Sequence, residues 1–313
     1  MPDPKHAVAT RSPARAGDRV FKGLATAAGV VILVALTGVG VFLTVQGIPA
    51  FTASRSELPG GHSVVAYIWP LAFGTLLGAF VALLIATPLS IGVALFISHY
   101  APRRLAGPLG YLIDLLAAVP SVVYGLWGIF FLAPRMVPLF QWLEQHLGFV
   151  PFFAGPASTT GRTMLTVGVV LAIMILPIST ALCREVFLQT PRLHEEAALA
   201  LGATRWEMIR MTVFPYARSG MVSAAMLGLG RALGETMAVA MLLSASGVVT
   251  FNMISPTNPS TIAANIALQF PEAVDININL LIASGLVLFV ITFAVNFAAR
   301  AVVNRRSEFS GAN

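Results

Sequence analysis

Six long runs of apolar residues divide the chain, and each is long enough to form a helix that crosses a membrane. About 20 mostly apolar residues suffice for such a helix. Pro120 interrupts the third run, and Arg231 and Glu235 lie within the fifth. The pattern predicts an all-α membrane protein with six transmembrane helices. The runs cover residues 24–45, 71–97, 109–133, 163–182, 221–245 and 278–303.

The composition agrees with the apolar runs. Of the 313 residues, 57% are hydrophobic and only 10% are charged, whereas a soluble domain carries about 25% charged residues. The mean hydropathy is +0.84. A soluble enzyme, a soluble nucleic-acid-binding protein and a disordered chain are therefore all poor interpretations of this sequence.

The basic residues predict the orientation of the chain in the membrane. Of the 19 lysines and arginines, Arg55, Arg135 and Arg162 fall in one set of connecting segments and Arg231 lies within a run. The other 15 lie in the opposite set, which includes both ends of the chain. Because basic residues favour the cytoplasmic side, we expect both termini inside and Ser56, Ser158 and Pro259 outside. The net charge of +6 then reflects orientation and contact with lipid headgroups, with no nucleic-acid partner.

The connecting segments are short, so one membrane domain occupies most of the chain. We expect a basic cytoplasmic arm at residues 1–23, poorly ordered up to Gly17, then a transmembrane domain at 24–306 and a tail at 307–313. The first run is longer than the core of a signal peptide and is interpreted as an uncleaved anchor. Residues 139–147 have one apolar and one polar face, which predicts a short interfacial helix.

Several kinds of chemistry are missing from the sequence. Lys5 and Lys22 are the only lysines, and neither ends a glycine-rich phosphate-binding loop, so this chain is not expected to hydrolyse ATP. Five scattered histidines form no metal motif, and no nucleophile elbow occurs. The single cysteine, Cys183, excludes an internal disulfide and is interpreted as a small apolar residue. We expect no cofactor, and a function based on passage or binding.

The longest predicted cytoplasmic segment, residues 183–220, has the pattern of a helix, a turn and a second helix. Glu195 and Glu196 suit the start of the first helix, whose one face carries Leu193, Ala197, Ala200 and Leu201. Gly202 can adopt the left-handed conformation that ends a helix. The second helix is predicted at 203–211, with Pro215 breaking or kinking it. An ordinary surface hairpin fits this pattern equally well.

The same segment resembles the EAA loop of ABC-importer permeases, whose pattern is Glu-Ala-Ala, three residues, Gly, nine residues and Ile-x-Leu-Pro. Thr212 and Phe214 depart from that pattern, outside the turn. The resemblance implies that the short helix around Glu195 docks on a separate ATP-binding subunit and transmits its closure to the membrane domain. The matching residues are Glu196, Ala197, Ala198, Gly202 and Pro215.

The fifth run carries two charges at membrane depth. A charge there costs at least about 2.5–3.5 kcal/mol on insertion scales, so such residues are paired or face water, and most are functional. Arg231 and Glu235 are four residues apart, which places them on one face of a continuous helix. An intrahelical salt bridge is the structural alternative to a functional site. Gly230 and Gly234 would let another helix approach closely.

Residues 228–239 resemble the signature Gly-x-Gly-Arg-Ala-x-Gly-Glu-Thr-Met-Ala of the phosphate-specific ABC permeases, and residues 113–128 resemble a second signature of that family. The resemblance implies a type I importer (MetI-like) fold and passage of inorganic phosphate past Arg231 and Glu235. It also implies a homologous permease partner, two ATP-binding subunits and an extracytoplasmic phosphate-binding protein. The basic arm and lone first helix are more similar to one of the family's two permeases. Asp114, in the second block, is better explained as a solvated or helix-start carboxylate than as a substrate ligand.

Two other functions stay open at this stage. A permease for another oxyanion, such as sulfate or molybdate, has the same coupling loop, and the 228–239 block favours phosphate over it. A membrane scaffold or receptor without a passage of its own is disfavoured by the intramembrane charges of Arg231 and Glu235.

Overall fold

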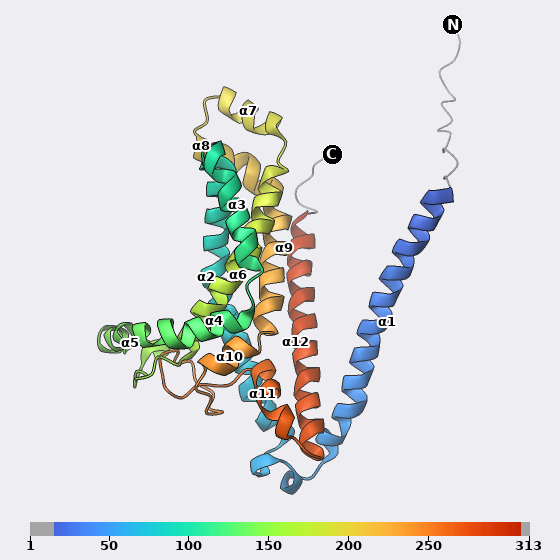
Figure 1. The fold of residues 1–313 in the computed structure, drawn as a ribbon, viewed down its shortest axis with the longest axis vertical. Coiled ribbons are helices and arrows are strands. Elements are labelled where there is room, and N and C mark those ends of the chain that lie inside the picture. Colours follow the sequence, from blue (N-terminus) through green and yellow to red (C-terminus); the bar gives the residue numbers. More distant parts are fainter. Residues whose placement is uncertain (1–15, 308–313) are drawn as a thin grey trace.

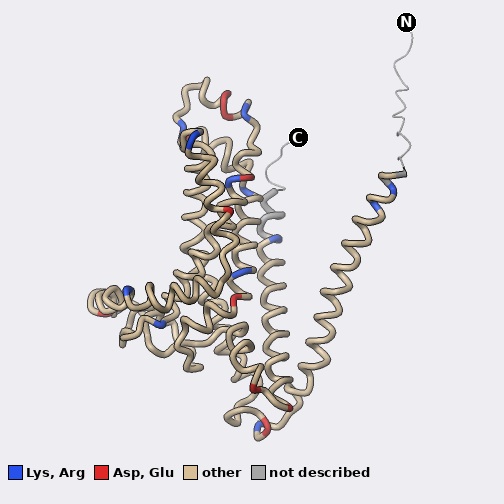
Figure 2. The backbone as a smooth tube through the Cα atoms, in the orientation of Figure 1, with Lys and Arg blue, Asp and Glu red and all other residues tan. Residues whose placement is uncertain are grey.

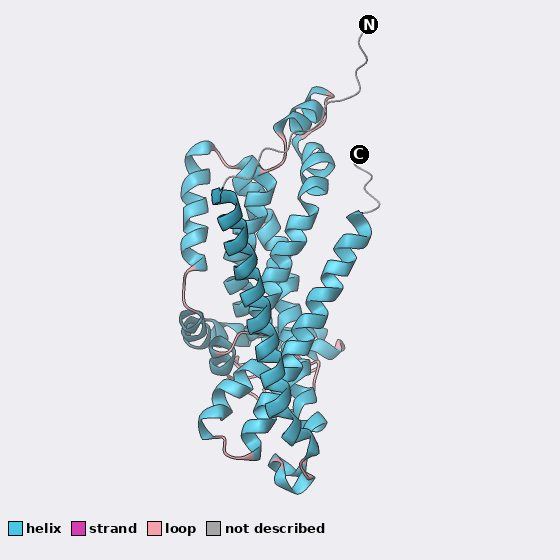
Figure 3. Cartoon of the chain, turned by 90° about the vertical axis from the view of Figure 1, so that its right-hand side faces the viewer, coloured by secondary structure: helices cyan, strands magenta, loops and turns pink. Residues whose placement is uncertain are grey.

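The computed structural model describes residues 16–307, and within this range the chain folds as helices, with one isolated bridge between Ala245 and Asn258. Figure 3 shows the helices from the side. The α-helices are α1 (Ala16–Thr52), α2 (Val64–Leu95), α3 (Arg103–Ala117), α4 (Ser121–Trp127), α5 (Ala133–Leu147), α6 (Met164–Leu188), α7 (Arg192–Ala200), α8 (Arg205–Met208), α9 (Phe214–Leu233), α10 (Met237–Leu242), α11 (Ile262–Gln269) and α12 (Ile276–Ser307).

The long helices α2, α3, α6, α9 and α12 run side by side along the long axis, and α1 leans away from them (Figure 1). A core of small and branched residues lies between α2, α6 and the region of α9 and α10. Short α7 crosses one end of the bundle, and the start of α1 and the end of α12 lie at that same end (Figure 1). We call this the α7 end.

Five helical segments of the described residues are long and apolar enough to cross a membrane. Figure 2 shows that long stretches of the upright helices carry no charged residue. The predicted fifth segment is present as α9, which is more polar because it contains Arg218, Ser219, Ser223 and Arg231. The prediction of an all-α membrane protein is confirmed. The segments are Arg19–Thr52, Val64–Tyr100, Ser121–Leu147, Met164–Leu188 and Ile276–Ala301.

Two of the six predicted helices are divided, the third at the interruption that Pro120 predicts and the fifth at a position that the sequence did not indicate. In the third run, α3 ends at Ala117 and α4 begins at Ser121, directly after Pro120, whose ring and missing N–H stop a helix. The chain then continues as π-helical η4 (Gly128–Leu132) into α5, and α4 and α5 lie crosswise to the upright helices (Figure 1). In the fifth run, α9 ends at Leu233 and α10 begins at Met237. The predicted helix at 139–147 is the second part of α5.

Helix α1 packs against α12 along only part of its length. A Cβ added at Gly47 would lie 3.2 Å from the Cα of Ala283, and one at Gly40 would lie 3.7 Å from the ring of Phe289. Before Gly40, the described side chains of α1 are exposed. Residues 16–23 of the expected arm extend this helix, whereas 1–15 and most of the tail lie outside the described residues.

At the end opposite α7, the loop at residues 244–261 is held by a buried asparagine. Asn258 is 0% exposed, and its Oδ1 accepts a hydrogen bond of 3.0 Å from the backbone N–H of Met164. Its Nδ2 lies 3.1–3.4 Å from the carbonyl oxygens of Ser255, Ser244 and Arg162. One side chain therefore joins the loop to the start of α6 and the end of α10.

Candidate functional site

The two sequence blocks at 113–128 and 228–239 meet in space, because α4 packs against α10. A Cβ added at Gly125 would lie 3.0 Å from the Cα of Ala238, and one at Gly128 would lie 2.9 Å from the methyl groups of Leu242. Glycine at these two positions lets the short helices approach closely. Arg231 belongs to the second block and lies in the last turn of α9, directly before the interruption that leads into α10.

Arg231 lies in the last turn of α9 and lines an open groove of about 860 Å³ between α6, α9 and α12. Ser219, Ser223 and Gly230 line the same groove from α9, at spacings that keep them on one helical face. Across from them, α12 contributes Asn296 and Arg300, together with apolar side chains. The groove thus offers two guanidinium groups, two hydroxyls and one amide, all of which can donate hydrogen bonds to an anion.

Glu235 lies in the interruption between α9 and α10 and is only 8% exposed. Its Oε1 accepts a hydrogen bond of 3.2 Å from the backbone N–H of Ala238, in the first turn of α10. A carboxylate at this position satisfies an otherwise unpaired helix-start amide and interacts favourably with the helix dipole. Glu235 therefore has a structural role that its position in an unbroken helix did not suggest.

The prediction that Arg231 and Glu235 lie on one face of a continuous helix is wrong. Because α9 ends at Leu233, Arg231 and Glu235 do not share the face of one helix. Within residues 16–307 the only ion pair within 4.0 Å joins other residues, so the intrahelical salt bridge is not found. The predicted close approach at Gly230 is also not found within this chain, since a Cβ added there would meet nothing within 4 Å.

The helix–turn–helix prediction for the α7 end is confirmed in outline. Helix α7 is followed by Gly202 with φ of +88°, the left-handed conformation expected for this glycine. The second helix begins at Arg205, where Thr204 and Glu207 cap each other's backbone N–H groups. Hydrogen bonds from the backbone and side chain of Thr204 lower the pKa of Glu207 below its ordinary value.

Of the predicted break or kink at Pro215, the break is not found, because the backbone stays helical from α8 through π-helical η6 (Ile209–Val213) into α9. Pro215 lies in the first turn of α9. The wider π turn before it gives room for the proline ring, which would collide with a carbonyl four residues earlier in a regular α-helix.

Helix α7 presents its predicted apolar face to the outside. Leu193 is 79% exposed and Leu201 is 90% exposed, and Ala197 and Ala200 are exposed on the same face. Glu196 is exposed as well. Such a short helix with an uncovered apolar face is suited to contact with another protein.

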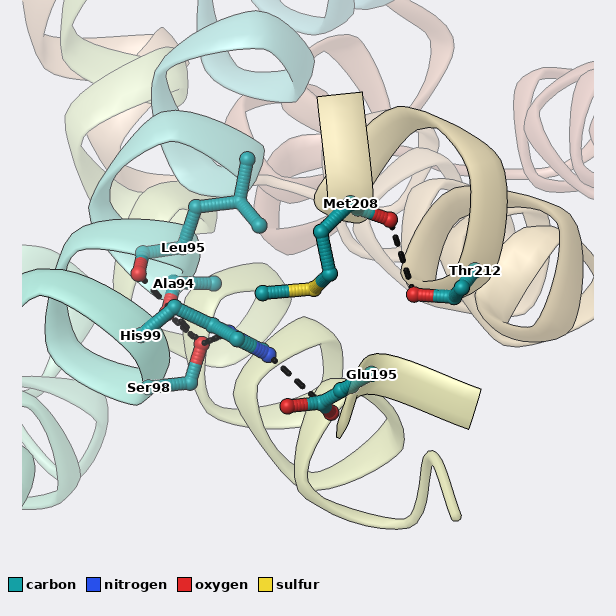
Figure 4. Close-up of polar contacts among 7 residues, drawn as sticks. All are labelled: Ala94, Leu95, Ser98, His99, Glu195, Met208 and Thr212. Carbon is teal, nitrogen blue, oxygen red and sulfur yellow. Dashed lines mark hydrogen bonds and ion pairs between the residues drawn. The ribbon is translucent and has the colours of Figure 1, made fainter. Parts of the chain in front are cut away.

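Sequence reasoning missed the polar contact that holds α7. His99, in π-helical η3 (Phe96–Tyr100) at the end of α2, places its Nε2 3.6 Å from Oε1 of Glu195 (Figure 4). The contact joins residues far apart in the chain, so no local spacing could have revealed it. Asn258 was missed for the same reason.

Two minor predictions have mixed outcomes. Cys183 is 1% exposed in an apolar cluster near the end of α6, as predicted for a small apolar residue. Asp114 is exposed, which agrees with a solvated carboxylate. However, it lies in the last turn of α3, far from Arg103 where that helix begins, so the helix-start alternative is wrong.

Comparisons with known proteins give a consistent result. The family described as "Binding-protein-dependent transport system inner membrane component" matches residues 86–308. The chain is 46% identical to a protein of Mycobacterium tuberculosis named phosphate transport system permease protein PstC 2, over 93% of both chains. It is 40% identical to the PstC protein of Xylella fastidiosa strain Temecula1, over 94% of this chain and 93% of that one.

Solved structures show the same fold at low sequence identity. A bacterial ABC transporter that imports the acidic polysaccharide alginate matches 92% of this chain and 99% of its own, with a TM-score of 0.57 and 14% identity. The alginate transporter in complex with its pentasaccharide-bound periplasmic protein matches with a TM-score of 0.60 and 16% identity. These two likenesses support a permease-type helix arrangement.

Proposed function

The chain belongs to the family of binding-protein-dependent transport system inner membrane components, and from this premise we propose that it is the permease subunit through which an ATP-driven importer moves inorganic phosphate into the cell. The observation that carries the proposal is the groove beside Arg231, in a chain 46% identical to a phosphate permease. The arrangement favours passage over a scaffold or receptor, because a groove lined by guanidinium and hydroxyl groups suits a moving anion.

In the proposed assembly, translocation, delivery of phosphate and ATP hydrolysis are functions of different subunits. A PstC-type chain would pair with a homologous PstA-like permease, receive phosphate from a PstS-like binding protein and take energy from two PstB-like ATP-binding subunits. The permease domain at 24–306 carries the coupling loop at 183–220. Exposed Leu193 and Leu201 on α7 support docking of an ATP-binding subunit there, together with the EAA residues Glu195, Glu196, Ala197, Ala198, Gly202 and Pro215.

The proposed orientation puts the α7 end in the cytoplasm. The predicted cytoplasmic segments, with 15 of the 19 basic residues, include α7 and the segments before α1 and after α12. Helix α7, the start of α1 and the end of α12 share one end of the bundle (Figure 1). Tags near Ser56, Ser158 and Pro259 should label from outside the cell, and labelling of any of them from the cytoplasm would contradict the topology.

Arg231 is proposed to bind the passing phosphate. Its planar guanidinium offers two parallel N–H groups that match two phosphate oxygens, which a lysine ammonium cannot do. From Arg231 to Ser219 the polar stripe of α9 extends about 18 Å toward the α7 end, at 1.5 Å per residue. Hydroxyls along this stripe would replace water around the ion without holding it so tightly that release is slow.

Glu235 is proposed to contribute selectivity. Its Oε1 already accepts the Ala238 amide, and its remaining lone pairs can accept a hydrogen bond from a protonated phosphate oxygen. Sulfate has no such proton at neutral pH and would meet an unrelieved negative charge. A permease for sulfate or molybdate is the second candidate, and a carboxylate in this proposed role argues against it.

The test is uptake of radiolabelled phosphate, normalised to membrane-inserted protein, with sulfate as the competitor. Arg231→Gln should abolish uptake while the complex still assembles, Arg231→Lys should retain little, and Glu235→Gln should impair uptake or admit sulfate. Arg55→Gln, in a predicted outer segment, is the control. Wild-type uptake in Arg231→Gln at equal expression would refute the role of the guanidinium.

A steric variant tests the groove without changing a charge. Gly230→Leu fills open space, since a Cβ at Gly230 meets nothing within 4 Å, and it should block uptake while the complex still assembles. Gly92→Leu is the matched control, because Gly92 in α2 is equally open but lies outside the groove. Normal uptake in Gly230→Leu would mean that phosphate takes another route.

A further inference from the structure

Helix α7 is attached to the rest of the chain through very few side chains. None of its residues is buried, and only Glu195 and Ala198 are partly covered. These two residues are three positions apart, so they share the inner face of the helix. Ala198 packs on the apolar cluster formed by the ends of α2 and α6 with α8, η6 and α9. An alanine methyl group has no directional contact to offer, which leaves Glu195 as the side chain that can fix the orientation of α7.

The partner of Glu195 is held rigidly. His99 is 10% exposed and Glu195 is 22% exposed at their side chains. Nδ1 of His99 lies 2.7 Å from Oγ of Ser98, and this hydroxyl lies 2.8 Å from the carbonyl oxygen of Ala94 (Figure 4). The ring of Phe187 meets the imidazole edge-on at 6.5 Å between centroids. The imidazole is thus fixed by both α2 and α6.

The hydrogen bonds also orient the imidazole. Its Nδ1 faces the hydroxyl of Ser98, which itself bonds to the carbonyl oxygen of Ala94, so the opposite ring nitrogen points away from α2. Nε2 faces the carboxylate of Glu195, and an unprotonated nitrogen would repel it. The contact is attractive when Nε2 carries a proton, which then points at the carboxylate.

A π turn at the end of α2 positions the imidazole of His99. Residues Phe96–Tyr100 form a π turn, closed by a hydrogen bond of 2.7 Å from the backbone N–H of Ala101 to the carbonyl of Phe96. A π turn interrupts the regular helical register and is frequently found at functional sites. Helix α2 in turn packs along α6 and α9, the helices that line the groove beside Arg231.

We infer that His99 is a positioning residue: with Glu195 it fixes the orientation of α7 on α2, so that movement of a docked ATP-binding subunit reaches the helices around the phosphate groove. This inference rests on the proposed function, since it requires α7 to be the docking helix. The outer face of α7, with Leu193 and Leu201, binds the partner, and the inner face passes the movement on. Loss of the ion pair leaves docking intact and weakens transmission.

The experiment uses the complete importer reconstituted in liposomes, and it measures phosphate transported and ATP hydrolysed in the same sample. His99→Gln and Glu195→Gln should keep the ATP-binding subunits attached but lower the phosphate moved per ATP about two- to fivefold, the range of one partly exposed ion pair. The double variant should be no worse than either single variant. His194→Gln, on an exposed neighbour in the same helix, should couple as the wild type.

A charge exchange separates positioning from simple structural support. The exchanged pair His99→Glu with Glu195→His should recover a large part of the coupling that each of these substitutions loses alone. Unchanged coupling in both glutamine variants, or additive losses without recovery in the exchanged pair, would overturn the inference. A wild-type complex that binds no ATP-binding subunit or moves no phosphate would instead overturn the proposed function.

Discussion

The two ends of the bundle hold their long connections in opposite ways. The loop at 244–261 contains several polar side chains that are less than 10% exposed, and Asn258 alone bonds to both neighbouring helices. The connection at the α7 end has no buried residue in α7, and among the described residues one ion pair joins α7 to another helix. A buried polar network rigidifies its surroundings, whereas a lightly attached helix can move with a partner. The molecule therefore combines a fixed end with a lightly attached end.

The largest expected effect is at the fixed end. Asn258→Ala removes the acceptor of the Met164 amide and the donor to three carbonyl groups. Each unpaired buried group costs about 1–3 kcal/mol, so we expect a loss of about 3–5 kcal/mol in stability. Thermal unfolding of the purified chain in detergent would measure it. Thr257→Ala, at an exposed neighbour, should change little, and equal melting temperatures for both variants would show that the loop is not fixed through Asn258.

A smaller loss of stability is expected at the turn after α7. Gly202 has φ of +88°, and a β-branched residue there stores about 1–3 kcal/mol of strain. Gly202→Val should therefore lower the melting temperature slightly but disrupt the geometry of α7 and impair coupling, measured as phosphate moved per ATP. Gly202→Asn, which tolerates this conformation, should couple nearly normally. Normal coupling in the valine variant would reduce the segment to a surface hairpin.

The N-terminal cap of α8 should contribute less to the stability of the chain than Gly202 does. Thr204→Ala removes the hydroxyl that accepts the Glu207 amide, at a cost of about 1 kcal/mol. The pKa of Glu207 is lowered in the folded chain, so the stabilisation by its carboxylate is present above its ordinary pKa and disappears as the pH falls through the lowered value. Hydrogen exchange at the start of α8, measured against pH, should show faster opening in acid. A protection factor that stays the same across this pH range would mean that Glu207 does not stabilise the cap.

The smallest effect on stability, and the largest on assembly, is expected on the outer face of α7. Leu201 is 90% exposed, so Leu201→Asp should change the stability of the isolated chain by less than about 0.5 kcal/mol. The same change should prevent co-purification of the ATP-binding subunits, because it places a charge in an apolar contact. Leu24→Asp is not a suitable control, although Leu24 is 66% exposed, because this residue lies in a segment long and apolar enough to cross a membrane. Glu185→Gln, at another exposed position of this end, should leave co-purification normal.

The sequence predicted the lightly attached end better than the centre of the bundle. The glycine after α7 and the apolar residues of its outer face act locally, so their roles could be inferred from spacing. The interruption at Pro120 was visible in the sequence, whereas the one at Gly234 could not be located from hydropathy, because the helices on both sides of it are mostly apolar. Contacts of Glu195 and Asn258 join distant segments and became visible only in three dimensions. The resemblance directed attention to Arg231, but it did not predict the position of this residue at the end of a helix.

The π turn at Ile209–Val213 determines in which direction the side chains of α9 point relative to α8. A π turn holds one residue more than an α turn, and each residue of an α-helix rotates the chain by about 100°. Deleting one residue in this segment would convert it to a regular turn and rotate α9 by about that angle relative to α8. Ser219, Ser223 and Arg231 would then leave the groove together, although none of them had been altered. The direction of the guanidinium thus depends on a count of residues at the α7 end, about five helical turns away.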